Sequence, residues 1–246
     1  MRIKTGLALA TLPVLFSIAP ANATTFTFEG HNLPGNQSAG KNSHIKTTFD
    51  DNTDILTWSS TYTYDPSSTT ALADGAWLVL SDGENPKNNA DEYAIFYLDG
   101  INEKVSIYNY DGANSANSYQ YEHFLGSEAL TVTNNGYDRT FEFSIDMSDI
   151  NNDTAGLFDD TTWKGAAFDE NIGIWFHGAG NLTTQYNNNN SNDGLHTFTY
   201  TNQSWYDTAN QTATAVPEPG SMAALGLFAL AAVGKLRKRS SDALGE

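Results

Sequence analysis

The residues best suited to hold a metal ion form an acidic stretch in the second half of the chain. Asp149, Asn151 and Asp153 take positions 1, 3 and 5 of an EF-hand-like count, in which Asp160 is position 12. Alternating oxygen ligands let a loop wrap around Ca²⁺, and a more distant carboxylate completes the shell. Position 6 is Thr154, where the sharp turn of such a loop uses glycine. The spacing therefore predicts either a calcium site or ordinary turn and cap chemistry.

A shorter acidic stretch, residues 50–54 (DDNTD), is a second and weaker calcium candidate. We expect no cofactor other than such a calcium ion. The chain has no cysteine, which excludes thiol catalysis, cysteine-ligated zinc and iron–sulfur clusters.

Signals for catalysis are weak. The five histidines are scattered and form no His-Glu-x-x-His helix, and there is no Gly-x-Ser-x-Gly elbow. Glycosidases need two carboxylates across a cleft. Glu142 and Asp146 share one face of an expected strand, but Phe141 and Phe143 then share the other face. This alternation indicates a strand with its apolar face in the core and its acidic face in solvent, so we expect no enzyme.

Aromatic residues are more numerous than one buried sheet face requires. Exposed rings stack on sugars, and Asn and Asp side chains bind hydroxyl groups, so this composition suits a glycan-binding module. Core packing and cross-strand pairs explain the same rings equally well. The rings in question are Tyr62, Tyr64, Tyr108, Tyr110, Tyr119, Tyr121, Trp163 and Trp205.

The first 23 residues have the organisation of a secretion signal. Arg2 and Lys4 give a charged beginning, residues 7–19 form an apolar run, and Ala21 and Ala23 supply small residues at the cleavage positions. This order predicts removal by signal peptidase after Ala23. The alternative, a first buried helix, would have to tolerate two prolines.

The C-terminal end has a second pattern in three parts. Pro217, Glu218 and Pro219 come first, and residues 221–234 follow without a charge. As a helix that apolar stretch is roughly 21 Å long, against roughly 30 Å for a bilayer core, which is short for a permanent span. The positive-inside rule should keep the basic cluster that follows in the cytoplasm. This cluster consists of Lys235, Arg237, Lys238 and Arg239.

These three parts, in this order, resemble the PEP-CTERM sorting signal. The resemblance covers about thirty of the 246 residues, including an apolar helix from Met222 to Val233. It implies that an exosortase, a membrane transpeptidase-like enzyme, recognises Pro217, Glu218 and Pro219. It also implies a Gram-negative-type host that makes exopolysaccharide. Only sorting follows from it, and a permanent tail anchor is the alternative.

The charge of the chain excludes some partners. Residues 24–215 hold 26 acidic and 6 basic residues, a net charge near −20, while the whole chain has −17. Without a basic stripe the domain should not bind nucleic acid, and it should repel anionic membrane surfaces.

Hydrophobicity between the two signals alternates with a period of two, which is typical of β-strands. The expected strands are rich in β-branched and aromatic residues and are separated by Asn, Asp and Gly turns. We expect about nine to eleven strands in an all-β, antiparallel, jelly-roll-like two-layer β-sandwich. Residues 77–80 and 93–98 are near-continuous apolar runs, as in strands covered on both faces. Residues 25–28 (TFTF) and 197–200 (TFTY) mirror each other, and we expect them to pair or to lie as neighbours.

The expected organisation is a signal peptide (1–23), a sandwich domain (24–207), a linker (208–215) and a sorting signal (216–246). The chain should be exported, inserted transiently in the inner membrane, processed by signal peptidase and exosortase, and delivered to the cell surface or exterior. There we expect a non-catalytic protein, structural or glycan-associating, in an exopolysaccharide matrix. The alternative is a secreted β-sandwich glycan hydrolase or lyase.

Overall fold

The computed structural model describes residues 24–33, 35–82, 93–110, 117–120, 124–148, 171–187, 194–212 and 214–217. Nearly all regular structure in these residues is antiparallel β-strand, and η1 (Ser118–Gln120) is a short 3-10 helix. The prediction of an all-β, antiparallel fold is therefore confirmed for the described residues. They form fifteen strands, more than the sequence led us to expect.

Six strands form one sheet in the order β15-β1-β3-β4-β10-β9, with every neighbouring pair antiparallel. Their bounds are β1 (Thr24–His31), β3 (Lys41–Asp50), β4 (Ile55–Thr63), β9 (Thr131–Asn135), β10 (Asp138–Asp146) and β15 (Thr214–Pro217).

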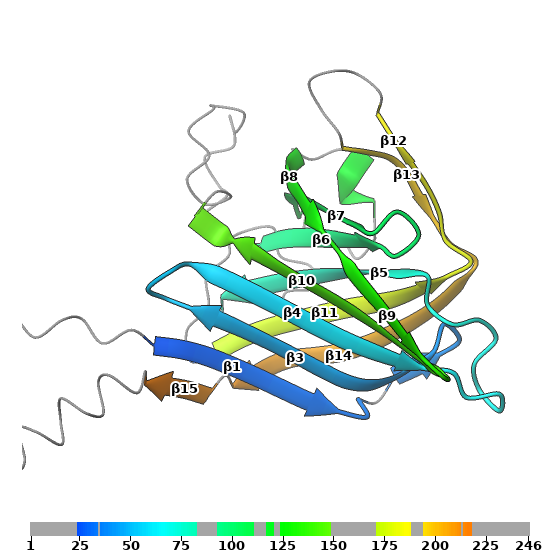
Figure 1. Ribbon diagram of the computed structural model, residues 1–246, viewed down its shortest axis with the longest axis horizontal. Helices are drawn as coiled ribbons and strands as arrows, with labels where there is room; N and C mark the ends of the chain where they lie inside the picture. Colours follow the sequence, from blue (N-terminus) through cyan, green and yellow to red (C-terminus); the bar gives the residue numbers. More distant parts are fainter. Residues whose placement is uncertain are drawn as a thin grey trace, which may run out of the picture.

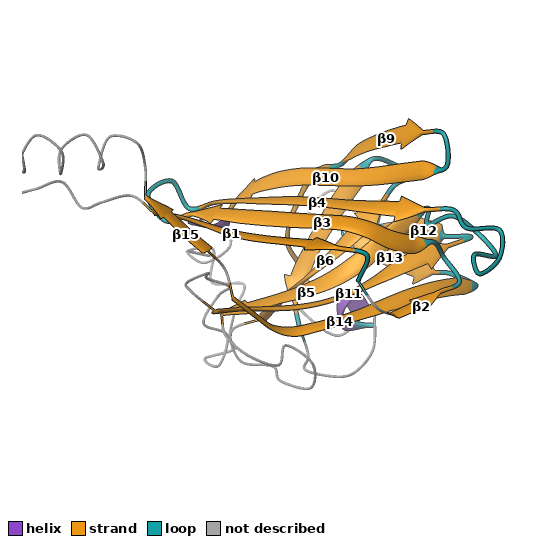
Figure 2. Cartoon of the chain, turned by 90° about the horizontal axis from the view of Figure 1, so that it is seen from below, coloured by secondary structure: helices purple, strands orange, loops and turns teal. Residues whose placement is uncertain are grey.

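Seven strands form a second antiparallel sheet in the order β2-β14-β11-β5-β6-β7-β8, which lies against the first (Figure 1 and Figure 2). Their bounds are β2 (Gly35–Gln37), β5 (Gly75–Asp82), β6 (Tyr93–Asp99), β7 (Lys104–Asn109), β8 (Phe124–Ala129), β11 (Asn171–Gly180) and β14 (Asn202–Thr212). A separate pair, β12 (Thr183–Tyr186) and β13 (Leu195–Thr199), forms a third, two-stranded sheet.

The chain crosses directly between the two large sheets at their edges. At one edge β8 leads through the buried Leu130 into β9. At the other edge β14 of the seven-stranded sheet is followed after one residue by β15 of the six-stranded sheet. These crossings hold the edges of the two layers together.

The main core lies between the two sheets, because period-two alternation directs one side of each strand inward. Leu56, Trp58 and Phe143 enter it from the six-stranded sheet, and Phe96 and Phe176 enter from the other. The Trp58 and Phe176 rings meet edge to face with centroids 5.7 Å apart, and Phe96 and Phe143 stack at 5.6 Å.

A second core covers the outer face of the seven-stranded sheet. Trp77, Tyr97 and Trp175 point away from the main core and are nonetheless buried. Leu195 and Phe198, from the two-stranded sheet, pack against them. The prediction of strands covered on both faces is thus confirmed for residues 77–80 and 94–98, and the second core accounts for much of the aromatic excess.

Asp99 links the two-stranded sheet to the seven-stranded sheet through hydrogen bonds. Its buried carboxylate accepts backbone N–H groups of Ile101 and Asn102 at 3.0 Å, which closes the turn after β6. The same group accepts hydroxyl hydrogen bonds from Thr184 at 2.5 Å and from Tyr186 at 2.9 Å. Burial, followed by the nearby Asp99 charge, raises the pKa of Tyr186 well above its ordinary value, so this hydroxyl remains a donor.

The expected partnership of residues 25–28 and 197–200 is wrong. In the structure β1 lies between β3 and β15, whereas β13 pairs with β12. The residues expected to form a linker, 208–215, instead fall largely within β14 and β15. Neighbouring backbones hold such edge segments through the hydrogen bonds of the ladder, which need no apolar alternation.

Candidate functional site

The outer face of the six-stranded sheet is a regular array of short polar side chains. Strand registers align Glu29, Lys46, Ser59, Glu142 and Thr131 in one row across five strands. Neighbouring hydroxyl groups bond across the strands, as in the pairs Thr48–Thr57 at 2.5 Å and Thr61–Thr140 at 2.9 Å. This face therefore offers a dense set of hydrogen-bonding groups in fixed positions.

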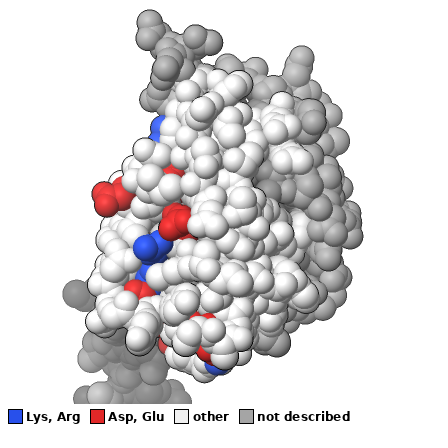
Figure 3. Space-filling model, turned by 90° about the vertical axis from the view of Figure 1, so that its right-hand side faces the viewer, with Lys and Arg blue, Asp and Glu red and all other residues white. Residues whose placement is uncertain are grey.

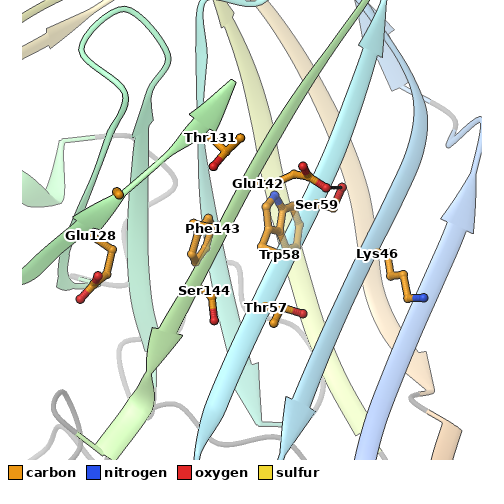
Figure 4. A pocket seen from close by; sticks show the side chains of 10 residues that line it. Lys46, Thr57, Trp58, Ser59, Glu128, Thr131, Glu142, Phe143 and Ser144 are labelled. Carbon is orange, nitrogen blue, oxygen red and sulfur yellow. Dashed lines mark hydrogen bonds between the residues drawn. The ribbon is translucent and has the colours of Figure 1, made fainter. Parts of the chain in front are cut away.

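A groove of about 560 Å³ lies on this array, where β8 and β9 approach β10 (Figure 4). Ser59 donates to Glu142 Oε1 at 3.2 Å, and in Figure 4 the Glu142 carboxylate points toward Ser59 and away from Glu128. The groove combines hydroxyls, two carboxylates and one ammonium group. Its lining residues are Lys46, Thr57, Trp58, Ser59, Glu128, Ala129, Thr131, Glu142, Phe143 and Ser144.

The sequence pattern anticipated part of this arrangement. Phe141 and Phe143 are in the core and Glu142 is exposed, so the prediction of an apolar inner and acidic outer face is confirmed for β10. Glu128 was not singled out from the sequence, because its strand, β8, shows no regular alternation of buried and exposed residues.

One end of the same face brings together Glu29, His31 and His44. The antiparallel register of β1 and β3 places His31 opposite His44 and Glu29 opposite Lys46. Nε2 of His44 lies 2.9 Å from Glu29 Oε1, and Nε2 of His31 lies 3.5 Å from the same oxygen. The hydrogen bond with His44 is the main cause that lowers the pKa of Glu29. Among the described residues, this is the group of three His, Asp or Glu side chains close enough to share an ion.

The sequence did not reveal this cluster, since thirteen positions separate His31 from His44 and only the strand register unites them. The pattern Glu-x-His on one strand, with a histidine early in the next, was the available signal.

The structure describes only the second of the two calcium candidates. Asp149, Asn151, Asp153 and Asp160 lie outside the described residues. In the second candidate, Asp50 Oδ1 accepts the backbone N–H groups of Asn52 at 2.9 Å and Thr53 at 3.2 Å. The second candidate thus shows the turn chemistry that was the alternative to calcium.

Four of the eight aromatic residues considered for sugar stacking are in the cores. Those buried are Tyr62, Tyr108, Tyr110 and Tyr119. Tyr121 and Trp163 lie outside the described residues. Trp205 is 45% exposed on β14, and Tyr64 stacks on the exposed Tyr137 with ring centroids 6.3 Å apart.

The two ends of the domain meet at one edge of the six-stranded sheet. Thr24, the first residue after the expected cleavage point, pairs with Pro217, the first proline of the sorting pattern. Ala21, Ala23, Glu218, Pro219 and the basic cluster 235–239 lie outside the described residues, as does the expected C-terminal helix. In the part of the chain that is described, no helix has the length and apolar character needed to cross a membrane.

Charges on the described surface are mixed. Figure 3 shows acidic and basic side chains interspersed along one side of the face in view, with uncharged residues over most of the rest. No basic stripe is visible on this face.

Comparison with known proteins identifies the C-terminal end. Residues 215–240 match the family model of the PEP-CTERM protein-sorting motif. The predicted resemblance is confirmed, and the motif indicates an exported protein sorted by an exosortase in a Gram-negative bacterium. No curated protein and no solved structure shows significant similarity to the chain.

Proposed function

We propose that the chain is a cell-surface protein whose sandwich domain associates, without catalysis, with extracellular polysaccharide. The match of residues 215–240 to the sorting motif supports delivery to the surface. The groove on the six-stranded sheet supports the association with glycan. Its hydroxyl groups, carboxylates and Lys46 ammonium can exchange hydrogen bonds with the hydroxyls of a sugar chain.

The negative charge of the domain determines which class of polysaccharide we expect it to bind. The mature domain has a net charge near −20 by sequence, and two of the groove's three charged side chains are acidic. An anionic polymer would be repelled at low salt. A neutral or amino-sugar polysaccharide meets no such penalty, so this is the expected ligand.

A hydrolase or lyase is the second candidate, because Glu128 and Glu142 line the same groove. A glycosidase usually works with two carboxylates, but these must face each other across the scissile bond. Glu142 is instead engaged by Ser59 at 3.2 Å and points away from Glu128 (Figure 4). This arrangement favours binding over catalysis.

A groove-filling substitution tests the proposal. Ser144→Trp places a large ring in the groove, and Thr133→Trp places the same ring outside it on the outer face of β9. We expect the wild-type protein and the Thr133→Trp control to be retained on neutral or amino-sugar polysaccharide, including cellulose and chitin, and Ser144→Trp to lose retention. Equal retention of both variants would place any binding elsewhere.

Release of reducing ends distinguishes the second candidate. The wild-type chain should release none during prolonged incubation with the bound polysaccharide. Release that disappears in Glu128→Gln and Glu142→Gln would establish the hydrolase instead.

A further inference from the structure

We propose that Glu29, His31 and His44 form a binding site for a divalent transition-metal ion of the zinc class. The inference goes beyond the proposed function and does not depend on it. The three side chains come from β1 and β3 and project from the outer face of the six-stranded sheet. Each offers one ligand atom, and the three atoms lie within 4.8 Å of one another.

The distances suit a small ion with nitrogen and oxygen ligands. Zinc binds imidazole nitrogen and carboxylate oxygen at about 2.0–2.2 Å, so adjacent ligands of a tetrahedral site lie about 3.3 Å apart. Glu29 Oε1 is 2.9 Å from His44 Nε2 and 3.5 Å from His31 Nε2, values on either side of that separation. The two imidazole rings stack with centroids 4.7 Å apart, and both Nε2 atoms lie near the same carboxylate oxygen.

The chemistry of the donors selects the class of metal. Imidazole nitrogen suits zinc, copper and nickel, whereas calcium and magnesium prefer oxygen alone. Three protein ligands leave a coordination position for water or another ligand, as in open zinc sites. The side chains of Glu29, His31 and His44 are 43%, 65% and 31% exposed, so that position faces solvent.

The charge of Lys46 allows a test of where the ion binds. Its ammonium group lies 4.0 Å from Glu29 Oε2, on the carboxylate oxygen that does not face the histidines. A cation bound at Oε1 would be repelled by this charge across one carboxylate. Replacing Lys46 with a neutral residue should therefore tighten metal binding at this site, whereas loss of a ligand should weaken it.

Calorimetric titration of the untagged full chain in detergent micelles with ZnCl₂ tests the site. Excess Ca²⁺ is kept present to occupy sites made of oxygen ligands alone. We expect one zinc equivalent, at least tenfold weaker binding in His31→Gln and His44→Gln, and tighter binding in Lys46→Gln. His196→Gln changes an exposed histidine on β13 and serves as the matched control with unchanged affinity.

X-ray absorption of the zinc-loaded protein supplies an independent readout. We expect two imidazole ligands in the wild-type protein and one fewer in each of the two histidine variants. The proposal is overturned if the wild-type chain shows no saturable zinc binding or if both histidine variants bind zinc as the wild type does. An affinity that fails to rise in Lys46→Gln would likewise contradict a zinc ion at Glu29.

Discussion

Thr24 and Pro217 are antiparallel partners at the edge of the six-stranded sheet. Thr24 follows the expected signal-peptide cleavage point, and Pro217 opens the sorting motif. The pairing continues through Thr25–Val216 and Phe26–Ala215, so β15 is the outermost strand and depends on β1 for its hydrogen bonds. The expected cleavage point and the start of the sorting motif therefore lie side by side at this edge of the sheet.

This geometry would suit a chain held at both ends by one membrane, which is what the sequence leads us to expect. Before processing, the signal peptide and the C-terminal apolar segment would both enter the inner membrane. Since their attachment points are adjacent, the sandwich can fold on the outer side without spanning the distance between two separate anchors.

Removal of the signal peptide should create a new ion pair. The Thr24 backbone nitrogen lies 2.6 Å from Asp51 Oδ1, and cleavage after Ala23 would turn this nitrogen into an α-ammonium group. Asp51→Asn should destabilise the processed protein by about 0.5 kcal/mol, a typical value for an exposed pair, and the unprocessed chain by less. Urea unfolding of both forms measures the difference, and equal losses would show that no such pair forms.

Asp99 should be among the most sensitive positions of the fold. Asp99→Asn puts an amide N–H₂ group where the carboxylate now accepts hydrogen bonds from Thr184 and Tyr186. Because the site is buried, we expect a loss of about 3 kcal/mol in the free energy of unfolding. Asp54→Asn, in an exposed turn at a positive φ of 55° that asparagine tolerates, is the control and should cost little. Similar urea midpoints for the two variants would contradict this role for Asp99.

Alkaline pH should weaken the domain through its buried tyrosines. Burial raises the pKa of Tyr206 to about 12, above the value of about 10 for an unfolded tyrosine. Between these values the folded state retains a proton that the unfolded state has lost, so stability is full below pH 10 and falls as pH rises toward 12.

Tyr206→Phe should reduce that alkaline decline. The same change removes a hydrogen bond to the Gly40 carbonyl at 2.6 Å and one from the Asn42 N–H at 2.7 Å. It should therefore cost about 1–3 kcal/mol at neutral pH. Unfolding midpoints measured across this pH range test the prediction. The control is Tyr137→Phe, which changes an exposed tyrosine. An unchanged alkaline slope in Tyr206→Phe would exclude this residue as a source of the decline.

Local periodicity predicted which side of the strongly alternating strands faces the core. In β10, for example, Phe141 and Phe143 are buried while Glu142 is exposed, as their alternation indicated. Residues 77–80 lack that alternation because a second core covers their outer face, and the sequence showed this too.

Pairing between distant strands could not be predicted in the same way. The similar segments 25–28 and 197–200 belong to different sheets, because composition does not specify a strand's partner. β15 has no apolar pattern of its own, and its place follows from the ladder with β1. The Glu29–His44 contact depends on the register of β1 and β3, so the cluster became visible only in the folded chain.

The central claim is that Pro217, Glu218 and Pro219 direct processing and release from the inner membrane. Each proline fixes φ and keeps the preceding residue out of the α region, which leaves an extended segment that a processing enzyme can hold. Mass spectrometry of the cell-surface protein, with and without replacement of all three residues by alanine, tests this claim most directly. The wild-type protein should begin at Thr24 and lack the basic cluster 235–239, while the triple-alanine protein should remain full length at its C-terminus in the membrane fraction. A wild-type protein that permanently retains the basic cluster in the membrane, or a triple-alanine protein that reaches the exterior without it, would contradict the account.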